Sequence, residues 1–243
     1  MAIEKLGSER LSAFLAFCRA HRTDVDDSFL YDEDLRKFVP SDEDPTYLAL
    51  ADGGRIVGAA SLMNSAYYRR GRKGRFRIFF VQDADPALYE DLLGRITQDS
   101  TGLDGLYVFV SADNGAMAEI LHALHFEIER SACVMLREPC PVEDPVWEDG
   151  YLLRTLVFNR DEDDYCYVRN LGFANLKGSD TPLAPSEVSR LEAGDDYIPG
   201  GILLLVTKEN RSAWCGPQGM SITKRRSSAS DRWRWYRRSA DSA

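Results

Sequence analysis

The side chains that most often perform catalysis or bind metals are few in this chain and widely spaced. It has three histidines, and its five cysteines include no Cys-x-x-Cys pair and no histidine at the spacing of a metal ligand. His122 and His125 lie three residues apart and could share one helix face, either as solvated or packed residues or in a catalytic role. We therefore expect no metal site and reduced cysteines.

Asn114 lies in the most informative stretch, Leu106–Phe126. This stretch opens with the apolar run LYVFV, which is typical of a strand, and continues with apolar residues spaced close to every 3.6 positions. Asn114 stands at the start of that second segment, where its side chain can cap a helix by accepting a backbone hydrogen bond. We expect a strand, a tight turn and an amphipathic helix, a combination common in α/β domains.

The composition is that of an ordinary globular protein. The chain has 243 residues, of which 44% are hydrophobic and 28% charged, and this length suits one large domain or two smaller ones. No apolar run approaches the roughly 20 residues that span a bilayer, and the N-terminus lacks the apolar core of a secretory signal. We expect a cytoplasmic protein without a membrane partner.

Several further segments have helix or strand patterns. The basic loop Arg69–Arg75 holds five Arg and Lys within seven residues, and is either a solvated hairpin tip or a rim facing a phosphate. The predicted elements are helices at Glu9–Ala20 and Leu35–Val39, strands at Thr46–Ala51 and Arg55–Leu62 joined by an Asp-Gly-Gly turn, a strand at Phe76–Val81, a helix from Pro86, and one or two strands in Glu127–Arg137.

This element order, together with V-x-x-x-N from Val110 to Asn114 and a Phe twelve residues after the Asn, resembles an acetyltransferase domain of the GNAT superfamily. The resemblance implies an α/β fold with a mixed central sheet flanked by helices, over residues 1–138. It also implies transfer of an acetyl group from acetyl-CoA to an amine on a small molecule or peptide. Carried over residue by residue, it makes Phe80, Val81 and Asn114 the expected cofactor-binding residues.

The first unit departs from the family pattern at its chemical positions. The family binds the cofactor pyrophosphate on a Gly-rich loop at a helix N-terminus, but the loop after Val81 reads QDAD, so Asp83 and Asp85 would face the phosphates. Leu121 stands where the family usually has a Tyr that acts as general acid, and His125 replaces a usual Gly. We assign no catalytic residue and expect a degenerate domain; the alternative is a non-catalytic binding or scaffolding protein.

A second unit follows a linker at 139–149, which is marked by three prolines. Residues 150–210 contain a predicted strand from Tyr151, helices at Glu162–Phe173 and Pro185–Leu191, and a strand at Ile202–Thr207. This order repeats the first half of the first unit and resembles the tandem GNAT arrangement, cut off before its cofactor loop. Asp195, Asp196 and Tyr197 could contact a cationic acceptor or belong to a solvated loop.

The basic tail, residues 211–243, has one Lys and seven Arg against two Asp, a net charge of +6, so residues 1–210 carry −15. One interpretation is nucleic-acid binding, with Arg on phosphates and Trp233, Trp235 and Tyr236 stacked on bases. The other is a frameshift. Permitted codons read from the third base give PVGLV and then IGPVALVSPE, which resemble GNAT strands in the correct order. We prefer the frameshift, which makes nucleic acid an unlikely partner, and expect the tail to be disordered.

Overall fold

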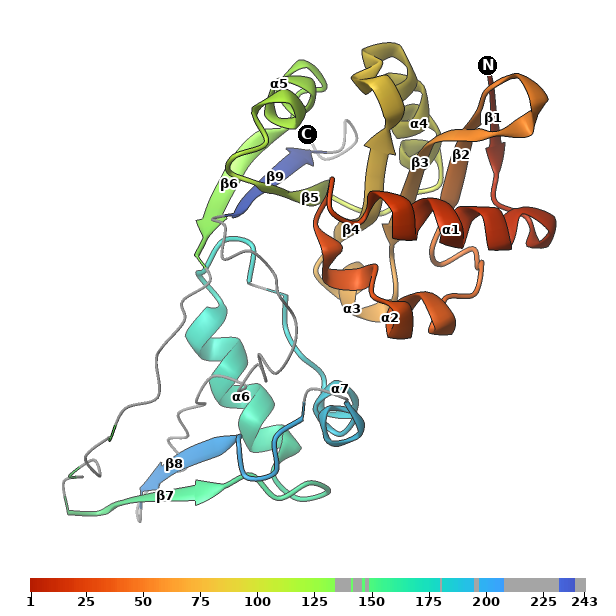
Figure 1. The fold of residues 1–243 in the computed structure, drawn as a ribbon. Coiled ribbons are helices and arrows are strands. Elements are labelled where there is room, and N and C mark those ends of the chain that lie inside the picture. The colour runs from red at the N-terminus through yellow and green to blue at the C-terminus, as the bar shows by residue number, and fades with distance from the viewer. Residues whose placement is uncertain are drawn as a thin grey trace. The chain divides into compact units, whose positions relative to one another are not determined.

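The computed structural model describes residues 1–133, 141, 146, 149–179, 181–194, 197–207 and 232–238. The chain divides into two compact units, Met1–Val134 with Ala229–Ala243 (unit 1) and Met135–Ser228 (unit 2). Each unit has its own sheet and its own core (Figure 1). Among the described residues, no helix is both long and apolar enough to cross a membrane.

Unit 1 contains the helices and strands that the sequence predicts, in the predicted order, and three further elements. The further elements are β1 (Ala2–Lys5), α3 (Ala66–Arg70) and β9 (Arg232–Arg238). The predicted elements are α1 (Leu11–His21), α2 (Asp32–Lys37), β2 (Thr46–Leu50), β3 (Ile56–Met63), β4 (Lys73–Val81), α4 (Pro86–Gln98), β5 (Gly105–Ser111), α5 (Gly115–Ala123) and β6 (Glu127–Ala132).

The seven strands of unit 1 form one mixed sheet in the order β1-β2-β3-β4-β5-β9-β6. Every neighbouring pair is antiparallel except β4 and β5, which are parallel. Helices flank this sheet, so the expected α/β architecture with a mixed central sheet is confirmed (Figure 1). The Asp-Gly-Gly turn between β2 and β3 is confirmed as well, with positive φ at Gly53 and Gly54.

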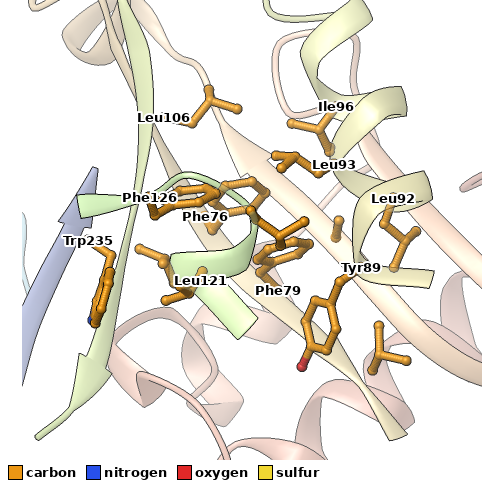
Figure 2. Packing of buried hydrophobic residues seen from close by; sticks show 14 of the residues in the cluster. Phe76, Phe79, Tyr89, Leu92, Leu93, Ile96, Leu106, Leu121, Phe126 and Trp235 are labelled. Atoms are coloured by element: carbon orange, nitrogen blue, oxygen red, sulfur yellow. The ribbon is translucent and has the colours of Figure 1, made fainter. Parts of the chain in front are cut away.

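Two apolar layers hold the helices on opposite faces of the sheet. On one face, Phe76 and Phe79 of β4 pack with Leu92 of α4 and with Leu121 of α5 (Figure 2). On the other face, residues of α1 and α2 pack against Ile78 and its neighbours in the sheet. Strand β4 therefore runs through the centre of the unit and has a buried residue facing each layer.

Strand β4 pairs irregularly with both of its neighbours, β3 and β5. Its pairing with β3 shifts register between Ser61 and Leu62, which leaves Arg77 as an extra residue in a β-bulge. Its parallel pairing with β5 covers only three residue pairs, from Lys73 with Gly105 to Arg75 with Tyr107. Beyond Arg75 the two strands diverge, so the sheet is split at the carboxyl ends of β4 and β5.

Strand β9 fills the gap between β5 and β6, and it pairs antiparallel with both. Gly105 of β5 permits its close approach, because a Cβ at that position would overlap the backbone oxygen of Arg237 and come within 2.5 Å of the Tyr236 ring. The Tyr236 hydroxyl also donates to the backbone oxygen of Asp104 at 3.1 Å. Two separate contacts thus fit the end of β9 to the start of β5.

The position of β9 corrects one sequence-based expectation. Residues 211–243 are expected to form a disordered tail, but Arg232–Arg238 is a strand paired on both sides, next to the edge strand β6, and the expectation is wrong for this segment. The sequence does not predict this strand because Arg is usually exposed. Here Arg234 is only 2% exposed, since it pairs with Glu129 at 3.0 Å and its guanidinium lies 3.5 Å from the centre of the Tyr107 ring. Trp235 is buried in the opposite layer.

Unit 2 consists of β7 (Tyr151–Thr155), α6 (Glu162–Phe173), α7 (Pro185–Val188) and β8 (Leu203–Thr207). This is the predicted order of strand, helix, helix and strand. The two strands pair antiparallel, and a small core forms around Tyr165, Val188 and Leu204. A two-stranded sheet is marginally stable by itself, so the helices supply most of the packing of this unit.

Some predicted features lie outside the described residues. These are the carboxyl end of the predicted strand region Glu127–Arg137, most of the linker 139–149, Asp195 and Asp196, and most of the tail 211–243.

Candidate functional site

A cavity of about 310 Å³ lies where β4 and β5 diverge. Its apolar wall includes Phe79 of β4, Val108 of β5 and Met117 of α5, and its polar rim includes Asp24 and Asn114. Ligands of sheets with parallel strands bind outside the carboxyl ends of those strands, where the connections leave an open crevice. The cavity is at such a place, between the two parallel strands of unit 1.

Asn114 occupies the rim of this cavity and joins two of its walls. Its side-chain oxygen accepts from the backbone N–H of Met117 at 3.1 Å, which caps helix α5 as predicted. Its side-chain nitrogen donates to the backbone oxygen of Asp24 at 3.5 Å. Both ends of the amide therefore have protein partners, and the residue links α5 to the segment between α1 and α2.

Phe80 and Val81, the other two predicted cofactor-binding residues, lie at the end of β4. The Phe80 ring stacks on His21 with ring centres 4.5 Å apart, on the face covered by α1. The Val81 side chain is buried in the opposite layer with α4 and α5. Of the three predicted residues, Asn114 has its side chain in the cavity lining, whereas Phe79, which the sequence does not single out, lines it from β4.

The turn between β4 and α4 contains Asp83 and is followed directly by Asp85. It comprises Gln82–Ala84, with Asp83 and Ala84 at positive φ values that glycine adopts more readily. Asp85 then caps α4 by accepting from the backbone N–H of Ala87 at 3.0 Å, and Pro86 has no N–H to offer. The N-terminus of α4, where a helix favours an anion, thus already carries a carboxylate of the chain itself.

A pyrophosphate does not fit this turn. Two like charges about 4 Å apart repel by about 1 kcal/mol in water and about 4 kcal/mol near a protein surface. Asp83 and Asp85 would each add such a repulsion, and the N–H of Ala87 is already used. Two features therefore oppose a pyrophosphate here. The acidic residues are evident from the sequence, whereas the capping of α4 by Asp85 is evident only from the structure.

Leu121, at the position where the resemblance implies a Tyr, is fully buried in the layer with Phe76 and Phe126 (Figure 2). It contributes packing and no acid. A tyrosine of α4, Tyr89, packs against β4, where its ring meets that of Phe79 edge-on with centres 5.0 Å apart. Burial raises the pKa of Tyr89, while a hydrogen bond with the backbone of Val81 acts in the opposite direction.

The basic residues at Arg69–Arg75 have partners within the protein. Arg72 forms an ion pair with Asp104 at 2.7 Å, and Arg75 forms one with Asp26 at 2.5 Å. Arg75 also stacks on the rings of Phe29 and Phe109. Lys73 and Arg75 belong to β4 rather than to a hairpin tip, so the interpretation as a solvated hairpin tip does not describe these two residues.

Histidine and carboxylate side chains form no metal-binding group in the described part of the chain. His122 and His125 are exposed at the end of α5, which agrees with solvated residues. His125 has a φ of 62°, the left-handed conformation that glycine adopts most readily, at the position where the family usually has Gly.

Unit 2 has its densest polar network at the start of α6. Asp161 is buried and accepts from Arg160 at 2.9 Å, from the backbone N–H of Val157 at 2.8 Å, and from Arg154. Burial opposes ionisation of Asp161, but these hydrogen bonds outweigh it and hold its pKa well below the usual range. Tyr197, proposed above as one acceptor contact, packs its ring against Phe158.

No family model matches the chain, and no curated protein matches it. Among solved structures it is similar to a GNAT-family acetyltransferase from Streptococcus pneumoniae, with 21% identity, a TM-score of 0.41, and coverage of 54% of this chain and 87% of the other. It is also similar to spermidine N-acetyltransferase from Vibrio cholerae in complex with CoA and spermine, with 13% identity, a TM-score of 0.43, and coverage of 54% and 83%.

A third similar structure is the ribosomal-protein-S18-alanine N-acetyltransferase from Escherichia coli, with 15% identity, a TM-score of 0.41, and coverage of 54% and 79%. At these identities the likeness concerns the fold alone. With TM-scores below 0.5, it carries no argument about the activity, cofactor or acceptor of this chain.

Proposed function

We propose that this chain derives from a tandem GNAT-type N-acetyltransferase that transfers an acetyl group from acetyl-CoA to an amine, and that unit 1 is its degenerate half. The observation that carries the proposal is the divergence of the parallel strands β4 and β5 around a cavity of about 310 Å³. Diverging strands leave backbone N–H and C=O groups unpaired at their edges, and these groups can hold an extended ligand.

In this proposal the backbone of Phe80 and Val81 lies along one side of the cofactor, and Asn114 lies at the opposite rim. The residues of unit 1 fit only part of acetyl-CoA. The apolar wall of the cavity suits the pantetheine arm, whereas the turn with Asp83 and Asp85 excludes the pyrophosphate. We therefore infer that unit 1 transfers no acetyl group. In this proposal the acetyltransferase activity of the chain is impaired for that reason.

Unit 2 is, in this proposal, the first half of the catalytic domain. Its order of strand, helix, helix and strand repeats that of α1, α2 and their flanking strands in unit 1. Leu153, Leu203 and Leu205 lie on the face of its small sheet opposite Leu204, and each stays partly exposed. The missing strands and helices of a complete domain would cover such a face.

The frame of the tail remains a separate proposal, since the structure describes only Arg232–Arg238 of it. The burial of Arg234 and Trp235 in unit 1 argues against the nucleic-acid interpretation for these two side chains, because neither can reach a phosphate or a base. We continue to propose a frameshift near Asn210. Sequencing the encoding DNA tests it, and an intact native reading frame through position 243 would overturn it.

Two specific observations favour a second function. Asp85 caps α4 with a carboxylate, and Leu121 stands where the resemblance implies a Tyr that acts as general acid. Unit 1 is therefore also consistent with a non-catalytic binding or scaffolding domain on the same fold. An assay of CoA release with a panel of small-molecule and peptide amines separates the two functions.

The assay compares this chain with a frame-corrected chain, in which the residues after Asn210 are read from the third base of each codon. Amine-dependent release of CoA by the corrected chain supports the enzyme. Release by neither chain, with both folded by circular dichroism, contradicts the enzyme and favours the binding protein.

A further inference from the structure

A chain of hydrogen bonds joins three segments of unit 1 beside the cavity. Arg55, next to β3, donates from Nη1 to Oε1 of Gln82 at 2.8 Å. Nε2 of Gln82 lies 3.2 Å from Nε2 of His21, and Nδ1 of His21 lies 2.9 Å from Oδ2 of Asp24. Asp24 in turn lines the cavity. This series of hydrogen bonds thus connects the turn after β4 with the rim of the cavity.

The partners fix the protonation of His21. A guanidinium only donates, so Arg55 requires the oxygen of the Gln82 amide to face it, and the NH₂ group must then face His21. The Nε2 atom of His21 therefore accepts with a lone pair. Its Nδ1 carries the proton and donates to Asp24. This arrangement requires a neutral imidazole in one tautomer.

Aromatic packing prevents the ring from rotating freely to another arrangement. Phe80 of β4 stacks on His21 with ring centres 4.5 Å apart, and Phe17 of α1 contacts it at the same separation. The His21 side chain is 18% exposed, so protons reach it from solvent. Asp24 faces the ring from the segment of His21 itself, Arg55 lies behind Gln82, and Asp83 follows Gln82 in the turn, whereas Phe17 and Phe80 carry no charge.

We propose that His21 is a proton-controlled latch between the α1–α2 segment and the turn Gln82–Ala84. Protonation places an N–H on Nε2, directly against the NH₂ group of Gln82, so that two donors face each other. If the Gln82 amide rotates to offer its oxygen, it turns its NH₂ group toward Arg55, and the other bond is lost. In either case, one of the two hydrogen bonds that hold Gln82 breaks.

The opposite end of the latch behaves differently. The hydrogen bond from Nδ1 to Asp24 becomes charge-assisted on protonation and strengthens. Acid therefore leaves the turn after β4 held by one of these two hydrogen bonds instead of both, while the cavity rim stays attached to α1. This turn already holds Asp83 and Ala84 at positive φ, so it relaxes once one of the two bonds of Gln82 is lost. The latch needs no acetyl-CoA and goes beyond the function proposed above.

Nuclear magnetic resonance of the full-length, isotope-labelled chain tests the latch between about pH 8 and about pH 5, the range in which histidine ordinarily titrates. At the upper end, the imidazole nitrogens of His21 should show the Nδ1–H tautomer. On acidification, the side-chain NH₂ signals of Gln82 should shift over the same pH range as the His21 ring, and the amides of the turn should lose hydrogen-exchange protection.

Matched variants locate the effect. In His21→Phe, which keeps an aromatic ring against Phe80, the Gln82 signals should no longer titrate, whereas in His122→Phe, at the exposed end of α5, they should titrate unchanged. In Gln82→Glu the carboxylate accepts from protonated Nε2, so acid should leave turn protection unchanged. Gln82 signals that stay constant through the His21 titration of the unmodified chain, or that still titrate in His21→Phe, would overturn the proposal.

Discussion

Asp85 caps helix α4 by accepting a hydrogen bond from the backbone N–H of Ala87 at 3.0 Å. The carboxylate lies where the helix dipole and the first backbone N–H groups would favour an external anion. The chain thus provides its own negative charge at this helix terminus. In the proposed function, this carboxylate makes the turn after β4 unfavourable for a pyrophosphate, although a cavity lies where β4 and β5 diverge.

The cap makes a prediction about local stability. Asp85→Ala should destabilise α4 by about 1 kcal/mol, whereas Asp85→Ser should change it by only a few tenths, because a serine hydroxyl also caps. Hydrogen exchange of the α4 amides measures both. Asn114→Ala, which removes the cap of α5 and the contact with Asp24, is the matched control and should leave α4 unchanged. Equal destabilisation of α4 by the Ala and Ser variants at Asp85 would show that the side chain is not acting as a cap.

Gly105 predicts how β9 depends on its neighbour. In Gly105→Ala the new methyl group would overlap the backbone of Arg237 and the ring of Tyr236, so β9 should lose its exchange protection while β2 and β3 keep theirs. Gly94→Ala is the control, because a Cβ at position 94 in α4 meets open space. That variant should stabilise α4 by about 0.5–1 kcal/mol. Unchanged protection of β9 in Gly105→Ala would contradict the observed pairing.

The buried pair of Arg234 and Glu129 should behave as a unit. Glu129→Gln leaves a buried guanidinium without its ion-pair partner and should cost about 3 kcal/mol of unit 1 stability. The double variant Glu129→Leu with Arg234→Met should recover most of that loss, because it removes both charges. Urea unfolding of the single and double variants gives the coupling. Additive losses would show that the two side chains do not interact.

Asp161 predicts a pH dependence for unit 2. Its pKa is lowered in the folded state, so its contribution to stability is complete above the unfolded value of about 3.9 and is lost as the pH falls through the folded value. Unit 2 should therefore lose stability on acidification below about pH 4. In Asp161→Asn this loss should be smaller, while stability near neutral pH should already be reduced. Urea titrations at several pH values, monitored by hydrogen exchange of the α6 amides, compare Asp161→Asn with the unmodified chain. Parallel pH profiles of stability would contradict the role given to Asp161.

Local patterns in the sequence predict most of unit 1. Apolar periodicity located α1, α4 and α5, and the Asp-Gly-Gly turn located the hairpin of β2 and β3. Asn114 was predicted as a cap and is one. In unit 2, the helix predicted at Glu162–Phe173 has those same bounds in the structure. Each of these features depends on residues within a few positions of one another, so a single sequence contains enough information.

The remaining features depend on distant contacts. Strand β9 alternates Arg with Trp from Arg232 to Trp235, which suits a strand, but four Arg in seven residues equally suit a solvated basic segment. Its place between β5 and β6 depends on distant residues, since Glu129 and Tyr107 accommodate the buried Arg234. The contacts between His21 and Gln82 join positions 61 residues apart, and no local signal marks them. Strand β1 was missed for the same reason, because its four residues are identified by pairing with β2.

Calorimetric titration of acetyl-CoA tests the central claim most directly, with this chain and the frame-corrected chain measured side by side. The account predicts no saturable heat with this chain, because in the proposed function Asp83 and Asp85 repel the pyrophosphate in unit 1 and unit 2 corresponds to the half of a domain that precedes the cofactor loop. It predicts saturable binding of one acetyl-CoA per corrected chain. Saturable binding to the present chain would contradict the claim that the acidic turn excludes the cofactor.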